Sequence, residues 1–565
     1  MRNIVIIGGM AAGCKAAARL SRLSSENRIT IIEKSPFVSL SRCGLPQFIS
    51  GDLDNVYELT KTPYGIKRDV NFFREFEGIN VLLNTEATDI DPWKKEVACI
   101  DHKNKDNVRI KYDELILATG CKNAEPVFPY VPSDRITFLH SVSGILEFRE
   151  KLQKGLIKKA VIIGGGIKGL ETAESLISLW GIETILIEKE NQILNSTLDY
   201  EISRYLEGCI NPGKILMLLS TSVEKIEKDK NELPVIYLDN GQKIVADSVI
   251  LCTGLVPDTE IAERINIKIG SSGGIIVDNQ MRTSIPEIWA AGDCIEIKNI
   301  LTDTPGHYPG GSNSNRLGRA AADSLSGEKV LFKGTVTTDS VKIFDYNICT
   351  AGLTEKSAVD AGFATGSVTG VWSDRADFHP DVNNIIGKLV YQKPGLKLLG
   401  LQLIGKGEIA RYIDVFCELL RERRTVKSLL CIEHAFNPSH SSPFTPLNYL
   451  GFMAINQEKD GVMNYNPLYL SSFTGMFVDV REKQDSESKP LPVHSLNIPF
   501  SEIRKRLNEF ETKQEIIFIC TKGGRSYETA RHFANKGFKN VAYLGGGSLL
   551  LNALKDEPKL EELMS

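Results

Sequence analysis

Two glycine-rich turns constrain the fold of this 565-residue chain more than any other feature of its sequence. Each turn follows a short β-branched run and opens a stretch typical of a helix, and an acid ends the next predicted strand. Glycine allows the tight turn, the N–H groups at the helix start bind a pyrophosphate, and the acid accepts hydrogen bonds from a ribose. The sequence therefore predicts two dinucleotide-binding units.

The two units differ at one position of the glycine fingerprint. The first turn follows residues 3–7 and carries Gly8, Met10, Ala11, Ala12 and Gly13, with Glu33 and Lys34 at the end of the next strand. The second turn follows residues 160–163 and carries Gly164, Gly166 and Gly169, with Glu188 as its acid. Met10 replaces the second glycine of the first fingerprint, whereas the second copy is complete. We expect all of these residues to contact cofactors.

Three further strand ends support a flavin together with a nicotinamide coenzyme. Residues 115–120 read LILATG, residues 249–257 read VILCTGLVP and residues 288–293 read IWAAGD. Each predicted strand delivers a turn of small residues to the sheet edge where open α/β sheets bind ligands. The residues expected to contact cofactors there are Ala118, Thr119, Gly120, Gly254, Gly292 and Asp293.

The choice between the two nicotinamide coenzymes depends on Glu188. A carboxylate accepts both ribose hydroxyls of NADH and repels the additional phosphate of NADPH. Lys168 and Lys189 are close in sequence to these elements and weaken that repulsion. We expect NADH, with NADPH possible.

Composition excludes several classes of function. The 67 basic and 71 acidic residues give a net charge of -4, which provides no positive field for a nucleic acid. Charged residues and glycines interrupt every apolar run, and the start MRNIVIIGG reads as a strand instead of a secretory signal, so we expect a cytoplasmic protein without a membrane span. The eleven cysteines form no CxxC or CxxxxC pair, which predicts mostly reduced, packed thiols such as Cys14, Cys252 and Cys294, and no metal site.

With these motifs in place, residues 1 to about 450 resemble the pyridine nucleotide-disulfide oxidoreductase family. SLSRCGLPQFISG around Cys43, VKIFDYN at Val341 and the stretch 438–448 are similar to its single-cysteine branch, the coenzyme A disulfide and persulfide reductases. The resemblance implies FAD, a homodimer and an α/β fold with two Rossmann-like domains and an α+β dimerisation domain. The implied limits are 1–112 and 255–328 for the FAD domain, 113–254 for the NAD(P)H domain and 329–452 for the dimerisation domain.

Cys43 is the candidate redox thiol. Gly44, Leu45 and Pro46 follow it and open a predicted helix, whose start favours a thiolate. No cysteine lies five positions away, so a local internal disulfide cannot form. The resemblance implies instead a mixed disulfide or persulfide between Cys43 and a small thiol, disulfide or persulfide substrate, resolved by the reduced flavin.

A second candidate site lies near the C-terminus. Residues 465–565 resemble a rhodanese domain of α/β type, with predicted strands at 476–481 and 516–519 and a loop from Cys520 to Arg525. Successive N–H groups and Arg525 form a positive cradle around Cys520. Four residues separate Cys520 from Arg525, one fewer than in the phosphatases that use a similar loop, which favours sulfur over phosphate.

The substrate site shows both similarities to the coenzyme A disulfide reductases and departures from them. Arg42 replaces an asparagine that contacts coenzyme A, Phe378 and Phe436 align with tyrosines, and Phe444 aligns with a phosphate-binding lysine. His379 and His440 lie near these positions and can supply protons instead. The residues expected at the substrate are Arg19, Arg22, Ser39, Arg42, Phe436 and His440. Coenzyme A disulfide, coenzyme A persulfide and polysulfide all remain open.

Together these features predict an FAD-dependent NAD(P)H oxidoreductase that reduces sulfur–sulfur bonds at Cys43, with sulfane sulfur handled at Cys520. One alternative is an NADH oxidase or peroxidase in which Cys43 cycles through a sulfenic acid. Another is a non-catalytic sulfur sensor or carrier. The direction of sulfur flow between Cys43 and Cys520 stays open.

Overall fold

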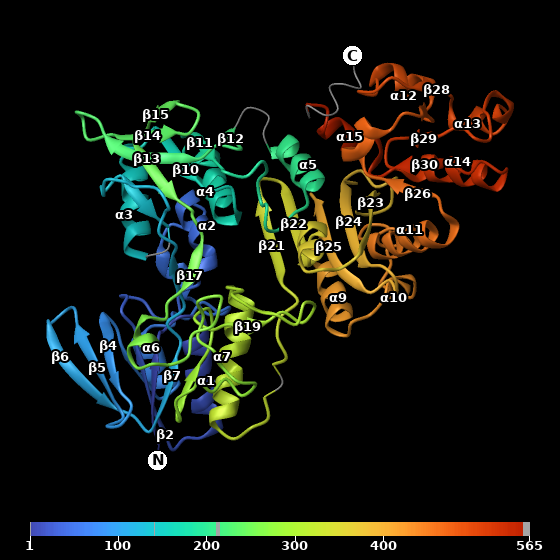
Figure 1. Cartoon of the computed structure of the whole chain (residues 1–565). Helices are drawn as coiled ribbons and strands as arrows, with labels where there is room; N and C mark the ends of the chain where they lie inside the picture. Colours follow the sequence, from blue (N-terminus) through green and yellow to red (C-terminus); the bar gives the residue numbers. More distant parts are fainter. Residues whose placement is uncertain (1, 140–141, 211–214, 331, 557–565) are drawn as a thin grey trace. The chain divides into compact units, whose positions relative to one another are not determined.

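The computed structural model describes residues 2–139, 142–210, 215–330 and 332–556, and it forms two compact units (Figure 1). One unit comprises residues 1–189 and 215–335, and the other comprises residues 190–214 and 336–565. The parts of the predicted domains at 140–141, 211–214, 331 and 557–565 lie outside the described residues. Within the described chain, no helix has both the length and the apolar character that crossing a membrane requires.

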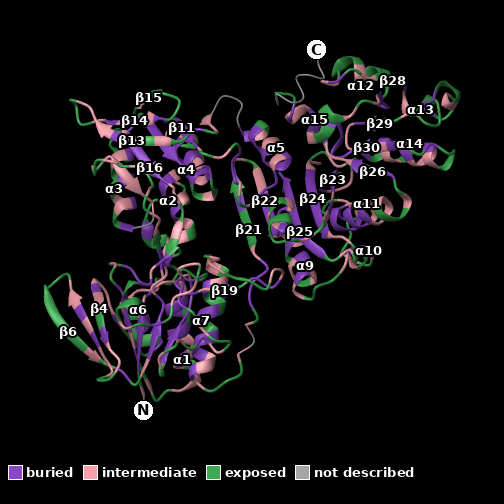
Figure 2. Ribbon diagram, viewed as in Figure 1, coloured by how far each residue is buried: buried purple, intermediate pink, exposed green. Residues whose placement is uncertain are grey.

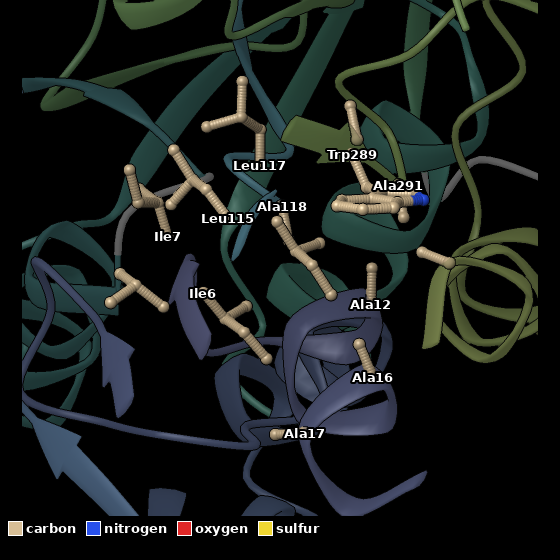
Figure 3. Close-up of a cluster of buried hydrophobic side chains, with 14 of the residues drawn as sticks. Ile6, Ile7, Ala12, Ala16, Ala17, Leu115, Leu117, Ala118, Trp289 and Ala291 are labelled. Atoms are coloured by element: carbon tan, nitrogen blue, oxygen red, sulfur yellow. The ribbon is translucent and has the colours of Figure 1, made fainter. Parts of the chain in front are cut away.

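The first unit begins with a five-stranded parallel sheet in the order β18-β7-β1-β2-β3. Its strands are β1 (Arg2–Ile7), β2 (Asn27–Ile32), β3 (Ile79–Leu82), β7 (Glu114–Leu117) and β18 (Ile288–Ala290), and its long helices are α1 (Ala11–Leu23) and α7 (Gly311–Leu325). Small residues let the two helices approach closely, because a Cβ at Gly318 would lie 2.2 Å from the Ala12 carbonyl oxygen. Ala12, Ala16 and Ala17 of α1 join the core formed by the strands (Figure 3).

A second five-stranded parallel sheet repeats this arrangement in the order β12-β11-β10-β16-β9. Its strands are β9 (Ile136–Phe138), β10 (Lys159–Ile163), β11 (Glu183–Ile187), β12 (Leu216–Leu218) and β16 (Ser248–Leu251), with α3 (Val142–Gln153) and α4 (Ile167–Ser178). In both sheets the glycine-rich turn follows the central strand and the acid follows its neighbour. Strand β7 shows that the first domain continues past residue 112, since it belongs to the first sheet, whereas β8 (Cys121–Asn123) pairs with β17 (Leu255–Pro257).

Each sheet is interrupted by a three-stranded antiparallel insertion that sequence analysis did not identify. The first consists of β4 (Thr85–Asp91), β5 (Glu96–Asp101) and β6 (Asp106–Lys111), and the second of β13 (Val223–Lys228), β14 (Pro234–Leu238) and β15 (Lys243–Val245). The remaining elements of this unit are α2 (Leu45–Ser50), α6 (Glu260–Arg264), β17 (Leu255–Pro257), β19 (Ile297–Lys298), β20 (Pro305–Gly306), 3-10 helices at Arg42–Gly44 and Val56–Thr60, and a π-helical turn at Phe72–Phe76.

The second unit contains a five-stranded antiparallel sheet in the order β21-β22-β25-β24-β23. Its elements are β21 (Thr338–Ile343), β22 (Tyr346–Gly352), β23 (Thr365–Ser373), β24 (Asn384–Gln392), β25 (Leu398–Gly405), α8 (Glu355–Asp360), α9 (Ala410–Arg421), α10 (Lys427–Leu430) and α11 (Pro446–Asp460). Strands β24 and β25 are almost wholly buried (Figure 2). Residues 190–214 of the predicted NAD(P)H domain, including α5 (Tyr200–Ile210), group with this unit.

The C-terminal part of this unit is a parallel sheet in the order β26-β30-β29-β27-β28. Its elements are β26 (Met463–Tyr465), β27 (Met476–Asp479), β28 (Leu496–Asn497), β29 (Ile516–Ile519), β30 (Val541–Leu544), α12 (Lys483–Ser488), α13 (Phe500–Ile503), α14 (Gly524–Asn535) and α15 (Gly547–Ala553), with 3-10 helices at Pro467–Ser472 and Leu507–Glu509. The edge strands β23 and β26 meet through one side chain: the Asn464 amide accepts from Thr369 N (2.8 Å) and donates to Thr369 O (3.1 Å).

Candidate active sites

The first glycine-rich turn is built by close backbone packing. Gly8 has φ +110°, and a Cβ there would lie 2.0 Å from the Ala118 carbonyl oxygen. A Cβ at Gly13 would lie 1.8 Å from the Gly8 carbonyl oxygen. Helix α1 then begins at Ala11 with no side-chain cap from Met10 and no acid in its first turn. The N–H groups at this helix start suit a phosphate, so the turn fits a dinucleotide despite Met10.

The acid of the first unit lies against this turn. The Glu33 side chain is buried, its Oε2 accepts from Gly9 N at 2.7 Å and its Oε1 accepts from Ser35 N at 2.9 Å. These bonds hold the carboxylate beside the turn, where a ribose of a bound dinucleotide lies in this fold. Lys34 points away to an exposed ion pair with Asp258 at 3.4 Å.

The second turn has the same construction. A Cβ at Gly164 would lie 2.4 Å from the Cys252 carbonyl oxygen, and one at Gly169 would lie 1.9 Å from the Gly164 carbonyl oxygen. A Cβ at Gly166, the residue before α4, would meet no heavy atom within 4 Å, which leaves room for a phosphate at the helix start. Glu188 Oε2 accepts from Gly165 N at 2.6 Å, so this turn also fits a dinucleotide.

Two hydrogen bonds hold the ATG turn after β7, one to the first sheet and one to the segment after β17. Ala118 N donates to Ile7 O at 2.8 Å and Thr119 Oγ1 donates to Asp258 O at 2.6 Å. Gly120 and Gly254 both have positive φ, and a Cβ at either would meet no heavy atom within 4 Å. The two turns therefore leave open space beyond the strand ends.

Asp293 organises the start of α7. Its Oδ1 accepts from Gly310 N at 3.1 Å and from Ser314 Oγ at 2.6 Å, and Gly292 before it packs against Ala12. The Asp293 carbonyl oxygen lies 2.9 Å from His307 Nε2, and burial lowers the pKa of His307. Asp293 is thus bonded to the residue before α7 and to the first turn of that helix, and its predicted contact with a cofactor stays a prediction.

Cys43 lies at the start of the same helix. It is exposed, within the 3-10 turn Arg42–Gly44, and its Sγ is 3.7 Å from the position of a Cβ built on Gly311, the first residue of α7. Helix α7 has fifteen residues, and its positive end favours negative charge on the sulfur, whereas the Asp293 carboxylate at the same helix start opposes it. The sequence indicated only the short helix α2 after Cys43.

Lys168, on the first turn of α4, adds positive charge near this thiol. Burial lowers the pKa of Lys168, and the neighbouring Cys43 opposes this effect. The sequence suggested that Lys168 weakens the repulsion between Glu188 and the additional phosphate of NADPH, and it did not indicate the relation of Lys168 to Cys43. The sequence feature that could have indicated this relation is the position of Lys168, two residues after Gly166 at the start of α4. This helix packs against α2, and Ser175 Oγ of α4 donates to Pro46 O.

Other cysteines of this unit differ from Cys43 in burial. Burial raises the pKa of Cys14 and of Cys252 to about 12, and it raises the pKa of Cys294 as well. Burial and the nearby Asp293 raise the pKa of Cys121 to about 12. The interpretation of Cys14 and Cys294 as buried packing residues is confirmed.

The predicted substrate residues fall into separate places. Arg19 Nε pairs with Asp323 at 2.6 Å and Arg22 pairs with Glu77 at 2.5 Å, both on α1. Ser39, with φ +56°, and Arg42 lie in the segment that carries Cys43. The remaining two, Phe436 and His440, are exposed in the second unit, and so are Phe378 and Phe444, the two other positions that depart from the family.

The C-terminal loop surrounds its cysteine with donors. Cys520 is 2% exposed, and its Sγ accepts from Gly523 N at 3.2 Å and from Ser526 N at 3.4 Å. Gly523 has φ +110° and precedes α14, so the helix start points at the sulfur. Arg525 Nη2 donates to Thr521 Oγ1 at 3.3 Å, which folds the loop back on itself. This cradle suits a thiolate or a terminal persulfide sulfur.

Comparison with known proteins places these sites in a family. Residues 2–314 match the pyridine nucleotide-disulphide oxidoreductases. The chain belongs to this family. Residues 338–447 match its dimerisation domain, and residues 468–550 match a rhodanese-like domain. The predicted family and fold class, and a pyridine nucleotide-dependent disulfide oxidoreductase as the class of enzyme, are confirmed.

Three similar proteins illustrate the range of the family. A solved NAD-dependent persulfide reductase from A. fulgidus is 33% identical, with a TM-score of 0.91 over 97% of this chain and 99% of the other. An NAD(P)H sulfur oxidoreductase (CoA-dependent) of Pyrococcus abyssi is 29% identical over 79% of this chain and 96% of its own length. An NADH oxidase of Methanocaldococcus jannaschii is 28% identical over 79% of this chain and 96% of its own length. The prediction of FAD and NAD(P)H as cofactors is confirmed at the level of the family.

Proposed function

We propose that this protein uses NAD(P)H and FAD to reduce the sulfur–sulfur bond of coenzyme A persulfide, coenzyme A disulfide or polysulfide at Cys43, while Cys520 carries sulfane sulfur. The observation that carries this proposal is the exposed Cys43 Sγ at the start of α7, in the unit that holds both dinucleotide-type turns. The names of the similar sulfur and persulfide reductases support the substrate class.

The residues at Cys43 suit an attack on sulfur. The Cys43 thiolate attacks one sulfur of the substrate, the substrate sulfur–sulfur bond breaks, and its electron pair leaves on the other sulfur as a thiolate or hydrosulfide. The start of α7 and the Lys168 ammonium stabilise the anionic sulfur before the attack. This attack leaves a disulfide or persulfide on Cys43; FAD bound at the first turn would supply the two electrons, derived from NAD(P)H, that cleave it to the Cys43 thiolate and a released thiolate or hydrosulfide.

Nucleotide contacts follow from the two turns. The N–H groups at the starts of α1 and α4 bind the two pyrophosphates, and Glu33 and Glu188 orient the riboses. The dimerisation domain supports a homodimer as the working form.

An NADH oxidase remains the second candidate, because a relative with that name matches the same 79% of the chain. The sulfur function is favoured by the Cys520 cradle, which an oxygen-reducing enzyme does not need. The two functions differ in the fate of NADH when oxygen is the sole acceptor.

The test compares Cys43→Ser and Cys520→Ser in the full chain with coenzyme A persulfide, coenzyme A disulfide, polysulfide and oxygen as acceptors. We expect Cys43→Ser to lose at least about 100-fold in NADH-dependent reduction of the sulfur acceptors, because the nucleophile is absent. Cys520→Ser should lose sulfur loading and keep the reduction of coenzyme A disulfide. Cys431→Ser, the control, changes another exposed cysteine and should leave both activities intact. Full sulfur-acceptor activity in Cys43→Ser would overturn the proposal, and rapid turnover with oxygen alone would favour the oxidase.

A further inference from the structure

The rim of the Cys520 cradle is bonded to the dimerisation domain. Lys522 Nζ donates to Ser373 Oγ at 2.9 Å, and Ser373 Oγ donates in turn to Asp377 Oδ1. Asp377 Oδ1 also lies 3.7 Å from the Lys522 ammonium. Ser373 ends β23 and Asp377 follows it, so a cation two positions from the sulfur-carrying cysteine is held by another domain.

A second set of hydrogen bonds also links the Cys520 loop to β23. Gly546 N donates to Thr369 O at 3.1 Å, and Ser548 N donates to Cys520 O at 2.8 Å. Gly546 and the first turn of α15, which follows it, therefore contact both β23 and the Cys520 loop. Because both segments around the sulfur are bonded to β23, Asp377 has a defined place beside Lys522 at the rim of the cradle.

Lys522, Arg525 and Asp377 contribute charge at the rim of the Cys520 cradle. Lys522 and Arg525 are the cations of the Cys520 loop, and Arg525 bonds within the loop to Thr521. Asp377, whose side chain is 85% exposed, places a negative charge beside Lys522. The pair is nearly neutral, so an approaching anion meets less attraction than the loop alone would exert.

We propose that Ser373 and Asp377 determine the sulfur-donor specificity of Cys520, disfavouring dianionic donors such as thiosulfate relative to persulfides of small thiols. This inference rests on the proposed role of Cys520 as a sulfur carrier. Asp377 supplies the repelling charge, and Ser373 holds Lys522 against it.

The two donors react by the same exchange and differ in charge. With thiosulfate, the Cys520 thiolate attacks the outer sulfur, the sulfur–sulfur bond breaks, and its electron pair leaves on sulfite as a cysteine persulfide forms. With an alkyl persulfide, the outer sulfur moves in the same way and the leaving group is a thiolate. Total charge is conserved in both reactions, but thiosulfate brings two negative charges to the rim of the cradle and the persulfide at most one.

The test measures sulfur loading of Cys520 in the full-length protein by intact mass, with thiosulfate and 2-hydroxyethyl persulfide as donors. We expect Asp377→Asn to raise the second-order loading rate with thiosulfate about fivefold at low salt, and that with the persulfide less than about twofold. The increase should appear in the dependence of the loading rate on thiosulfate concentration. It should become smaller at high salt, because an exposed charge is screened. Ser373→Ala, which releases Lys522, should act in the same direction, and Lys522→Met should slow loading by thiosulfate.

Glu511→Gln, which removes an exposed acid elsewhere in the same domain, is the matched control and should leave the donor ratio unchanged. An equal change for both donors in Asp377→Asn and Ser373→Ala, or a change that salt does not affect, would mean that the contact is merely structural and would overturn the inference. If wild-type Cys520 acquires sulfur from neither donor, the proposed carrier function itself fails. Loading of the wild type with an unchanged donor ratio in the variants overturns the specificity inference alone.

Discussion

Individual residues show which chemistry depends on charge and which depends on shape. At the two turns Gly8, Gly13, Gly164 and Gly169 are fixed by shape, since a Cβ at any of them would lie within 2.4 Å of a carbonyl oxygen. The role of Glu188 depends instead on its charge, and its carboxylate accepts a hydrogen bond from Gly165 N.

Coenzyme preference is the prediction that belongs to this scale. We expect the wild type to have the higher kcat/KM with NADH, and Glu188→Gln to reduce the ratio of NADH to NADPH by about tenfold. Glutamine keeps an acceptor for Gly165 N and removes the charge that repels the additional phosphate of NADPH. The measurement is kcat/KM for both coenzymes with one sulfur acceptor.

Glu183→Gln is the matched control, because Glu183 lies at the opposite end of β11 in an exposed pair with Lys159. Its coenzyme ratio should match that of the wild type. A wild type that strongly prefers NADPH, or an unchanged ratio in Glu188→Gln, would contradict the role given to Glu188.

The sequence was sufficient for these positions because their geometry is local. Turn, helix start and acid lie within one βαβ unit, so spacing alone predicts their arrangement. It was not sufficient for the surroundings of Cys43, because the start of α7 lies more than 260 residues away in sequence. Local spacing indicated α2, and only the folded chain brings Gly311 to the sulfur.

At the scale of elements, a buried charge cluster joins α5 and the segment before it to the antiparallel sheet. Lys388 of β24 is 2% exposed, and its Nζ lies 3.2 Å from Asp199, 2.7 Å from Glu201 and 2.8 Å from Glu355. Burial disfavours the charged ammonium and lowers the pKa of Lys388. The carboxylates of Glu201, Asp199 and Glu355 outweigh this effect and raise the pKa. Residues 190–214 consequently group with the second unit, a long-range contact that no motif in the sequence marks.

Lys388→Met tests this cluster. Removing the cation leaves buried carboxylates without a compensating charge. We therefore expect the free energy of unfolding of the second unit to fall by about 3–5 kcal/mol. The measurement is urea unfolding followed by a probe in this unit, and Lys388→Met should also loosen α5 in amide hydrogen exchange.

Lys393→Met serves as its control, because Lys393 pairs with Glu458 at 2.7 Å with 41% of its own side chain exposed. A partly exposed pair contributes at most about 1 kcal/mol. A cost for Lys388→Met no larger than that for Lys393→Met would show that the cluster does not hold α5 to the sheet.

At the scale of the whole molecule, the described chain joins two candidate cysteine sites, and the rhodanese-like domain is bonded to the dimerisation domain. Its edge strand β26 contributes Asn464, whose amide pairs with both backbone groups of Thr369 on the edge strand β23. Unpaired edges invite association with other chains, and this contact covers one of them. The motifs predicted both domains but not this contact, because no sequence motif distinguishes Asn464 from the other asparagines of the chain.

Asn464→Ala tests whether this side chain fixes the domain. Thr369 is buried, so loss of its partner leaves a backbone N–H without an acceptor, which costs about 1–3 kcal/mol. We expect faster hydrogen exchange at the Thr369 amide and separate unfolding of the rhodanese-like domain. Asn497→Ala, which removes amide bonds to Asp479 O and Arg481 O within that domain, should leave the Thr369 amide protected. Unchanged exchange at Thr369 in Asn464→Ala would mean that Gly546 and Lys522 hold the domain without Asn464, and that the sulfur-donor specificity of Cys520 does not depend on this asparagine.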